Sequence, residues 1–447
     1  MKILLVQADR DAGKYGKILP KFFIPSLALP QLAACTPKKH EIKIVNEWYE
    51  KVDFDEDCDL VAISAFTKDV YRAYEIADEF RQRGIKVVLG GYHPTALPVE
   101  AKQHADSVVI GEAEISWPKL LDDLEKGKLK PFYRSRKVRP EKIPSARKIC
   151  NGFIGAIQAS RGCPYRCEFC QLTGFGDNVH RKRPVKEVVD EIEAMPNKIF
   201  WFHDASLTID PRYSKKLFKE MIKRKLRKRW VAFGNMAILS RDKEFLRLAS
   251  RAGCIAWMVG VESVSQRVIE KEIGKGGNKI DRVPNMLEII EDEGMEVWAS
   301  FIFGFDNDTP ATFDATFQKL EEWGLKVAEF NILTPFPKTP IFEKLRRQNR
   351  IISFDWRKYD LNHAVFLPKH MTPEELEREV RKLSRKFFSI DRIIKRMLSA
   401  KSFRSKIFSF LANFAIRKFT DFDFEGGRMR YENIARNALY KVEGEFV

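Results

Sequence analysis

Short apolar runs alternate with amphipathic stretches along the first part of the chain. Residues 69–84, DVYRAYEIADEFRQRG, carry apolar side chains at helical spacing, and this pattern predicts a helix with Asp69 as N-cap and its end at Gly84. The apolar runs have the length of strands and lie at residues 2–8, 41–46, 60–66, 86–91 and 107–111. This alternation of strand and helix predicts a parallel α/β sheet.

The same alternation resumes after residue 150 as a longer series. Apolar runs typical of strands lie at residues 155–162, 198–206, 230–236, 255–263, 297–305 and 328–336. Helical segments are expected at residues 184–195, 211–226, 242–252, 264–272, 281–293 and 310–323. Six βα units in succession predict a partial barrel, in which functional side chains lie at the carboxyl ends of the strands.

Residues 128–150, between the two series, have the composition of a linker. They are basic and contain three prolines and one short aromatic pair. We expect an α/β domain at residues 1–135, a linker at 136–150, a partial barrel at 151–345 and a basic, mostly helical C-terminal region at 346–447.

The helical C-terminal region begins with a capping signal, MTPEEL. Thr372 is the expected N-cap, Pro373 the first helical residue and Glu375 the partner in a capping box. Apolar residues follow at helical spacing, in two groups: Phe387, Ile390, Ile394, Met397 and Leu398, then Phe403, Ile407, Phe410, Leu411 and Phe414. Residues 381–420 contain twelve lysines and arginines and one acid, Asp391. Such helices either pack onto the barrel or lie at a membrane interface, with the basic residues toward anionic lipid.

Composition indicates a folded intracellular protein. The 447 residues are 44% hydrophobic and 12% aromatic, which is enough for the cores of two or three domains. The longest apolar run near the N-terminus, ILLV, is shorter than the core of a signal peptide, and no stretch approaches the ~20 apolar residues of a membrane span. We expect a cytoplasmic protein, with residues 381–420 as an alternative peripheral contact at the inner face of the membrane. The formal net charge of +17 raises nucleic acid or anionic lipid as partners.

Three cysteines lie close together in the segment RGCPYRCEFC, at Cys163, Cys167 and Cys170. A structural zinc site closes with four ligands, and no second pair of cysteines or histidines at suitable spacing completes one. A disulfide framework does not fit seven cysteines in a chain without a secretory signal. An iron–sulfur cluster normally takes four thiolates, so three from the protein leave one iron open to a non-protein ligand.

The spacing C-x3-C-x2-C, with the aromatic Phe169 before the third cysteine, resembles the signature of the radical S-adenosylmethionine (SAM) superfamily. The resemblance implies that the three cysteines bind a [4Fe–4S] cluster, that SAM binds the open iron, and that one electron cleaves SAM to a 5′-deoxyadenosyl radical. It also assigns SAM contacts, from motifs at strand ends, to Phe169, Asp204, Glu262, Ser263 and Gly304. Ser263 and Asp308 have a second interpretation, as residues that cap the next helix.

The loops SAFT, GGYHPT and GEAE follow strands of the first series, where a doubly wound sheet binds its ligands. Placed ahead of the three cysteines, they resemble the cobalamin-binding subfamily of radical SAM enzymes, whose first domain is Rossmann-like. The resemblance assigns the cobalamin pocket to Ser64, Thr67, Gly90, Gly91, His93, Gly111 and Glu112. A tight turn explains paired glycines equally well. The D-x-H-x-x-G motif is missing, so His93 is assigned to the pocket wall and not to cobalt.

A further element, TPFPKTP at residues 334–340, resembles a proline-rich segment that closes the barrel in the subfamily. Lys338 stands where glycine is commoner. The lysine either alters the turn or avoids a positive φ.

The two cofactors imply an enzyme. The resemblance favours a methyltransferase that acts on an unactivated carbon with a 5′-deoxyadenosyl radical and methylcobalamin, on a small-molecule or lipid substrate, with a reducing partner such as ferredoxin or flavodoxin. Cyclisation or rearrangement without methyl transfer is the alternative. A basic nucleic-acid-binding protein with a structural metal site is disfavoured, because the C-terminal phenylalanines lie at core spacing and not as stacking residues. No catalytic residue is assigned.

Overall fold

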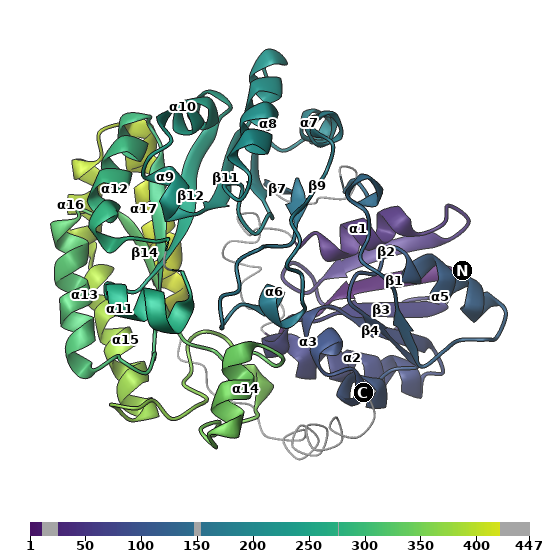
Figure 1. Ribbon diagram of the computed structural model, residues 1–447. Helices are drawn as coiled ribbons and strands as arrows, with labels where there is room; N and C mark the ends of the chain where they lie inside the picture. The colour runs from purple at the N-terminus through teal and green to yellow at the C-terminus, as the bar shows by residue number, and fades with distance from the viewer. Residues whose placement is uncertain (11–25, 147–152, 276, 421–447) are drawn as a thin grey trace.

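The computed structural model describes residues 1–10, 26–146, 153–275 and 277–420, with the side chains of residues 418–420 left out. Two parallel sheets with their helices face each other across the molecule, and C-terminal helices cover the second sheet on the side away from the first (Figure 1). Both sheets were predicted from the alternation of strand and helix, and both are confirmed.

The first sheet has six parallel strands in the order β2-β1-β3-β4-β5-β6. They are β1 (Lys2–Gln7), β2 (Glu41–Asn46), β3 (Leu60–Ser64), β4 (Lys86–Gly90), β5 (Ser107–Ile110) and β6 (Phe132–Arg134). β6 lies inside the α/β domain expected at residues 1–135, although the linker-like composition of residues 128–150 includes these three residues. β6 pairs with β5 at the sheet edge through the register Val108 with Phe132, and it is too short for its alternation to be visible in the sequence.

Helices cover both faces of this sheet. Apolar side chains of α1 (Ala28–Cys35) and α5 (Ser116–Glu125) pack in one core cluster, and those of α2 (Val70–Gln82), α3 (Tyr92–Ala96) and α4 (Pro98–Gln103) pack in another. The predicted helix after Asp69 is confirmed, but its carboxylate does not cap it. Asp69 instead accepts hydrogen bonds from the backbone N–H of Arg10 at 3.2 Å and from Nζ of Lys68 at 2.7 Å.

The second sheet also has six parallel strands, in the order β14-β13-β12-β11-β10-β7. They are β7 (Ile154–Ile157), β10 (Ile199–Phe202), β11 (Arg229–Gly234), β12 (Cys254–Glu262), β13 (Glu296–Phe303) and β14 (Val327–Ile332). The predicted strand 155–162 is divided in two. Its second part, β8 (Ser160–Arg161), leaves the sheet and pairs antiparallel with β9 (Arg181–Lys182), and this ribbon carries the cysteine loop.

The helices between these strands bury a large aromatic and aliphatic core against the sheet, with Trp230 and Trp257 fully buried. They are α7 (Val185–Ala194), α8 (Pro211–Lys223), α9 (Met236–Leu239), α10 (Lys243–Arg251), α11 (Gln266–Val268), α12 (Val283–Asp292) and α13 (Pro310–Glu322). After α11, Ile269–Ile273 form one π-helical turn. The predicted helix at 264–272 is therefore present but irregular, and π turns of this kind are frequent near functional sites.

After β14 the chain returns to the first sheet. It forms α14 (Pro340–Arg347) and a 3-10 turn (Trp356–Lys358), and the side chains of Phe342, Trp356 and Tyr359 are buried in the core of the first sheet. Residues on both sides of the expected boundary at 345/346 therefore belong to one core, and they join the two sheets.

Three helices end the described chain: α15 (Pro373–Phe387), α16 (Ile390–Ser399) and α17 (Phe403–Thr420). The capping box at Thr372 and Glu375 is confirmed, with hydrogen bonds of 3.2 and 2.9 Å. The apolar group expected on one side from Phe387 to Leu398 is not continuous. Phe387 ends α15 and is buried, whereas Ile390 and Leu398 belong to α16 and are exposed. Within the described residues, no helix has both the length and the apolar character needed to cross a membrane.

Candidate functional site

A cavity of about 940 Å³ lies between the carboxyl ends of the two sheets. The first sheet contributes Gln7 and Ser64 from its strand ends, and the second contributes Gln158, Ser160 and Asp204. A cavity of this size lies near the upper end of the range for ligand sites, and its place at the strand ends is the one expected for doubly wound sheets and barrels.

One wall of the cavity is aromatic. The rings of Phe66 and Tyr92 stack with centroids 5.6 Å apart. Phe175 directly follows the short helix α6 (Gln171–Gly174), and its ring centroid lies 5.5 Å from that of Tyr92. Phe66 and Tyr92 remain exposed although large apolar side chains normally avoid water. This wall spans both domains and fits a large flat ligand such as a corrin ring.

Four residues assigned to the cobalamin pocket line this cavity: Ser64, Gly91, Gly111 and Glu112. Gly90 lines a smaller adjoining cavity of about 210 Å³. Gly91 has a φ of 99°, and a Cβ atom there would lie 2.9 Å from the carbonyl oxygen of Ala65. The paired glycines thus allow a close approach of two loops at the cavity wall, which a side chain would prevent.

The assignment of His93 to the pocket wall is wrong. Its side chain is fully buried behind the wall, its Nε2 lies 3.1 Å from a carboxylate oxygen of Glu100, and its ring contacts Trp356. Tyr92 and Thr95 from the same helix line the cavity instead. Thr67 is also buried and does not line it. Among the described residues that line this cavity, the only histidine is His203, from the second sheet.

The cysteine loop is held at its base by backbone contacts. The N–H of Cys163 donates to the carbonyl of Asp177 at 2.9 Å, and the N–H of Cys170 donates to that of Cys167 at 3.1 Å. Burial raises the pKa of the Cys167 thiol to about 11 and also raises that of Cys163, while neighbouring cysteines add to both effects. The three thiols are therefore grouped in a partly dehydrated site.

No group of acidic, cysteine and histidine side chains in the described part of the chain is arranged to hold a single metal ion. This does not argue against a cluster, because three thiolates that each bind a different iron lie farther apart than ligands of one ion. Zinc, which needs four convergent ligands, does not fit this loop. The donor set fits a [4Fe–4S] cluster with one open iron.

A half-buried lysine next to the cysteines was not predicted. Lys275 forms an ion pair with Glu262, and its Nζ lies 5.7 Å from the ring centroid of Phe169. Burial alone lowers its pKa, but Glu262 and the thiolates of Cys167 and Cys170 raise it overall. The sequence around Lys275, IGKGGNK, resembles an exposed loop, and only the folded chain shows that this cation balances negative charge beside the cysteine loop.

Glu262 lies at a bulge where the pairing of β12 and β13 shifts register, and its φ is 69°. A Cβ atom on Gly260 would lie 2.1 Å from the Glu262 carboxylate and 3.0 Å from Nζ of Lys275, so a side chain there would displace this ion pair. Positive φ in a non-glycine residue costs free energy and is concentrated at functional sites. Phe169, Glu262 and the cysteines are thus brought together, as the predicted SAM contacts require.

The other residues assigned to SAM have different surroundings. Asp204 lines the cavity but already accepts hydrogen bonds from the N–H of Ala159 at 2.9 Å and Oγ of Ser160 at 2.5 Å.

Oγ of Ser263 accepts from the N–H of Ser265, which itself caps α11, so Ser263 is not a helix cap. Where a Cβ of Gly304 would lie, Leu376 and Phe366 fill the space. Gly304 itself is buried, and its N–H already donates to the Asp308 carboxylate.

The capping interpretation is also wrong for Asp308. Thr309 caps α13, whereas Asp308 accepts hydrogen bonds from the N–H groups of Gly304 and Phe305 at 2.8 and 2.9 Å. Burial raises the pKa of Asp308 to about 7 despite these bonds.

Lys338, in the proline-rich segment, has a φ of 67°, so it does not avoid the positive φ of the turn.

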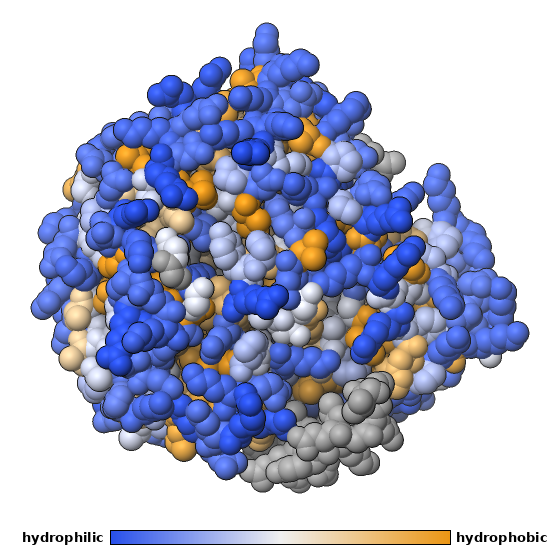
Figure 2. All heavy atoms as spheres, in the orientation of Figure 1, coloured by the Kyte–Doolittle hydropathy of each residue, from blue (hydrophilic) through white to orange (hydrophobic). Residues whose placement is uncertain are grey.

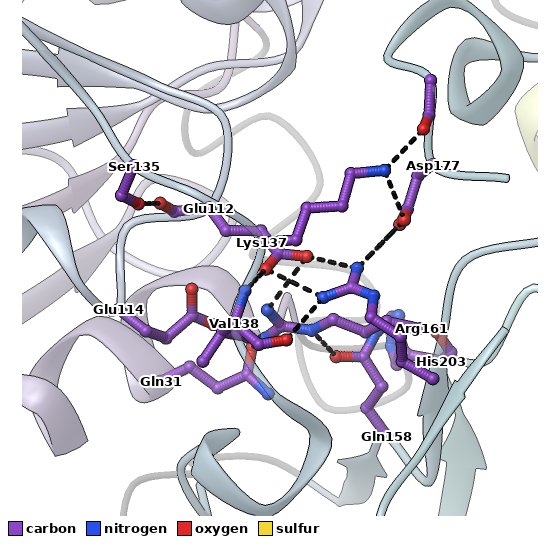
Figure 3. Close-up of polar contacts among 12 residues, drawn as sticks. Gln31, Glu112, Glu114, Ser135, Lys137, Val138, Gln158, Arg161, Asp177 and His203 are labelled. Carbon is purple, nitrogen blue, oxygen red and sulfur yellow. Dashed lines mark hydrogen bonds and ion pairs between the residues drawn. The ribbon is translucent and has the colours of Figure 1, made fainter. Parts of the chain in front are cut away.

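A network of ion pairs joins the two domains at the edge of the cavity (Figure 3). Arg161, directly before the cysteine loop, contacts Glu114 at 2.5 Å and Glu112 at 3.7 Å, and it donates to Gln31 at 3.0 Å. Arg181 pairs with Glu112 at 2.5 Å and with Asp177 at 3.0 Å. Burial alone would raise the pKa of Glu112, but the two arginines lower it. The loop that contains Glu112 and Glu114 and the cysteine loop are therefore fixed relative to each other.

Comparison with known proteins agrees with this geometry. The family model of the B12 binding domain matches residues 22–121, and that of the radical SAM superfamily matches residues 157–320. Bacteriochlorophyllide d C-12(1)-methyltransferase of Chlorobaculum tepidum is 32% identical over 81% of this chain and 82% of its own length. The C-8(2)-methyltransferase of the same organism is 31% identical over 78% and 82%. Hopanoid C-2 methylase of Rhodopseudomonas palustris is 24% identical over 77% and 68%.

A solved structure shares the fold. The radical SAM methyltransferase TsrM from Kitasatospora setae, with cobalamin and a [4Fe–4S] cluster bound, superposes with a TM-score of 0.64 at 20% identity, covering 85% of this chain and 84% of that one.

We predict that Asp308→Asn changes how stability depends on pH. Because the pKa of Asp308 is raised, the native state holds a proton that the unfolded state has lost, so stability falls as pH rises from about 4 to about 7. The variant keeps an oxygen acceptor but no charge, and should gain up to roughly 4 kcal/mol relative to wild type over this range. Thermal unfolding of both proteins at several pH values measures it, and parallel profiles would contradict it.

We predict that Arg161→Gln weakens cobalamin binding about tenfold or more, because it leaves Glu114 buried without its cation. Lys182→Gln is the matched control, since Lys182 lies on the same ribbon but forms an exposed ion pair with Asp210. Absorbance titration of both variants with cobalamin measures the effect. Equal affinities of the two variants would show that the network does not support the site.

Proposed function

Since the chain belongs to the B12-binding radical SAM methyltransferases, which use a [4Fe–4S] cluster, SAM and cobalamin, we propose that it methylates an unactivated carbon of a large hydrophobic substrate. Together these groups supply hydrogen-atom abstraction and a transferable methyl group. The observation that carries the proposal is the single cavity that reaches the strand ends of both sheets beside the cysteine loop.

Different residues beside the cavity would bind the cluster and SAM. Cys163, Cys167 and Cys170 would hold the cluster and leave its fourth position for SAM. Glu262, kept in place by Lys275 and by the space at Gly260, would bind polar groups of SAM, and Phe169 would cover one side. These residues exclude water and fix orientation.

Cobalamin would lie in the cavity against the aromatic wall of Phe66, Tyr92 and Phe175. Ser64, Gly91 and Gly111 would present backbone and small side chains to it. Among the described residues that line the cavity, the first sheet contributes no histidine that could bind cobalt.

Substrate class is supported by the relatives. Two relatives above 30% identity are named for methylation of bacteriochlorophyllide d, and a more distant one for methylation of hopanoid. Both substrates are large, hydrophobic ring systems. We propose a substrate of this kind, a tetrapyrrole or polycyclic lipid, and a reducing partner such as ferredoxin or flavodoxin, whose acidic surface would complement the net charge of +17.

The test is an anaerobic assay of the reconstituted enzyme with trideuteromethyl-labelled SAM and a panel that contains bacteriochlorophyllide d and hopanoids. We expect formation of 5′-deoxyadenosine and a product that carries one labelled methyl group on carbon. Deoxyadenosine formed together with an unlabelled, cyclised or rearranged product would establish the alternative and contradict methyl transfer.

We predict that Cys163→Ala, Cys167→Ala and Cys170→Ala each lose reductive SAM cleavage by at least about a hundredfold, because each removes one cluster ligand. Cys254→Ala is the control, since Cys254 is buried in the core of the second sheet, away from the loop. Iron and sulfide content and deoxyadenosine formation measure the effect. Unchanged SAM cleavage by Cys167→Ala would contradict the cluster assignment.

A further inference from the structure

The last helix of the described residues, α17, has its polar and apolar sides reversed relative to an ordinary surface helix. Its side toward the protein contains Ser405, Ser409 and Asn413, which are almost completely buried. Its outward side contains Phe403, 76% exposed, and Leu411, 56% exposed. A surface helix normally buries its apolar stripe and exposes its polar residues.

Specific polar contacts fix this orientation. Nδ2 of Asn413 donates to the carbonyl of Lys326 at 2.9 Å, at the start of β14, and the side chain of Ser405 hydrogen-bonds the Glu296 carboxyl at the start of β13. On the same side, Phe408 packs against an apolar cluster on the inner face of the second sheet. Rotating α17 to bury its apolar side would leave buried polar groups such as Glu296 without these partners, so the apolar side faces outward by construction.

The preceding helix, α16, also combines a buried charged residue with exposed apolar ones, although its Ile393 is buried in the core. Arg396 is buried, with its guanidinium carbon 3.7 Å from the ring centroid of Phe387 and an N–H donated to the carbonyl of Phe387 at 2.7 Å. Ile390 and Leu398, two turns apart, are each 61% exposed. Arg396 also reaches Oδ1 of Asn413 at 3.4 Å, which ties α16 to α17.

The two helices pack side by side, on the side of the second sheet away from the first (Figure 1). Their outward residues form what we term the C-terminal apolar face, which consists of Ile390, Ile394, Leu398, Phe403, Ile407, Phe410 and Leu411. On the side of the molecule that Figure 2 shows, most apolar residues lie scattered among hydrophilic ones. Grouped exposure of this kind marks an interaction site.

Basic residues border the face. Lys395, Lys401 and Arg404 are exposed, and Asp391 is the only acid between residues 390 and 417. A second copy of the chain is an unsuitable partner, because a two-fold contact would bring two basic borders together. Protein interfaces are also depleted of lysine. Branched aliphatic side chains at the centre do not suit nucleic acid, whose surface is charged.

We propose that the C-terminal apolar face binds the surface of a bilayer that contains anionic lipid. The apolar side chains insert at the boundary of headgroups and acyl chains, and the lysines and arginines contact lipid phosphates. The inference goes beyond the methyl transfer proposed above and does not depend on it. It gives the enzyme a way to reach a substrate that is dissolved in a membrane.

The test is vesicle flotation of the full chain without substrate. Wild type should float with vesicles of phosphatidylcholine and phosphatidylglycerol, weakly with phosphatidylcholine alone, and less as salt is raised. The double variant Phe403→Ser, Leu411→Ser should bind about tenfold less or weaker still, because it removes apolar contacts at two exposed positions. Leu367→Ser is the matched control, since Leu367 is exposed outside the face and should not matter.

The double variant Lys395→Glu, Arg404→Glu separates the electrostatic contribution to vesicle binding from the apolar one. This variant should lose the preference for anionic vesicles. Three outcomes would overturn the proposal: wild type that binds no anionic vesicle, equal binding by wild type and the Phe403, Leu411 variant, or light scattering that shows a dimer broken by that variant. Each is distinct from a failure of methyl transfer, because binding is measured without cofactor turnover.

Discussion

The ion pairs of Arg161 and Arg181 with Glu112 and Glu114 are the constraint on which the site depends. They join a loop of the first sheet to the base of the cysteine loop of the second, at the edge of the cavity. Buried charges are stable only when they are paired, so each side of this contact requires the other. The ion pairs therefore fix the two loops relative to each other at the edge of the cavity, while the apolar contacts of Phe342, Trp356 and Tyr359 join the two sheets.

The same principle explains the chemistry of the second sheet. Glu262 and, with a cluster bound, the thiolates of the three cysteines would place negative charge in a poorly hydrated region, and Lys275 would balance it from a loop after a π-helical turn. The strain at Glu262 and the missing side chain at Gly260 allow that pairing. The stability of the apolar cores thus offsets the cost of the strain at Glu262 and of the charged groups beside the cysteine loop, which the fold itself does not require.

The sequence predicts those features of the fold and the site whose pattern lies within a few neighbouring residues. Strands and helices of both sheets follow from apolar periodicity within a few residues, and the cysteine spacing is visible without a structure. The three-residue strand β6 has too short a pattern, and its pairing with β5 depends on distant residues. The burial of His93 behind Trp356 and the position of Lys275 beside the cysteines arise from contacts between segments far apart in the chain. The apolar spacing of α17 is shared by a core helix and an interfacial helix, so the sequence left both interpretations open, and the burial of Ser405, Ser409 and Asn413 shows which side faces outward.

The central claim is that one cavity between the sheets brings the cluster and cobalamin together. Diffraction from crystals of the anaerobically loaded protein, with data at the iron and cobalt absorption edges, tests it most directly. We predict an iron peak bounded by Cys163, Cys167 and Cys170, and one cobalt peak inside the cavity lined by Gly91, Tyr92 and Gly111. Cobalt bound outside this cavity, or iron away from the three cysteines, would contradict the account.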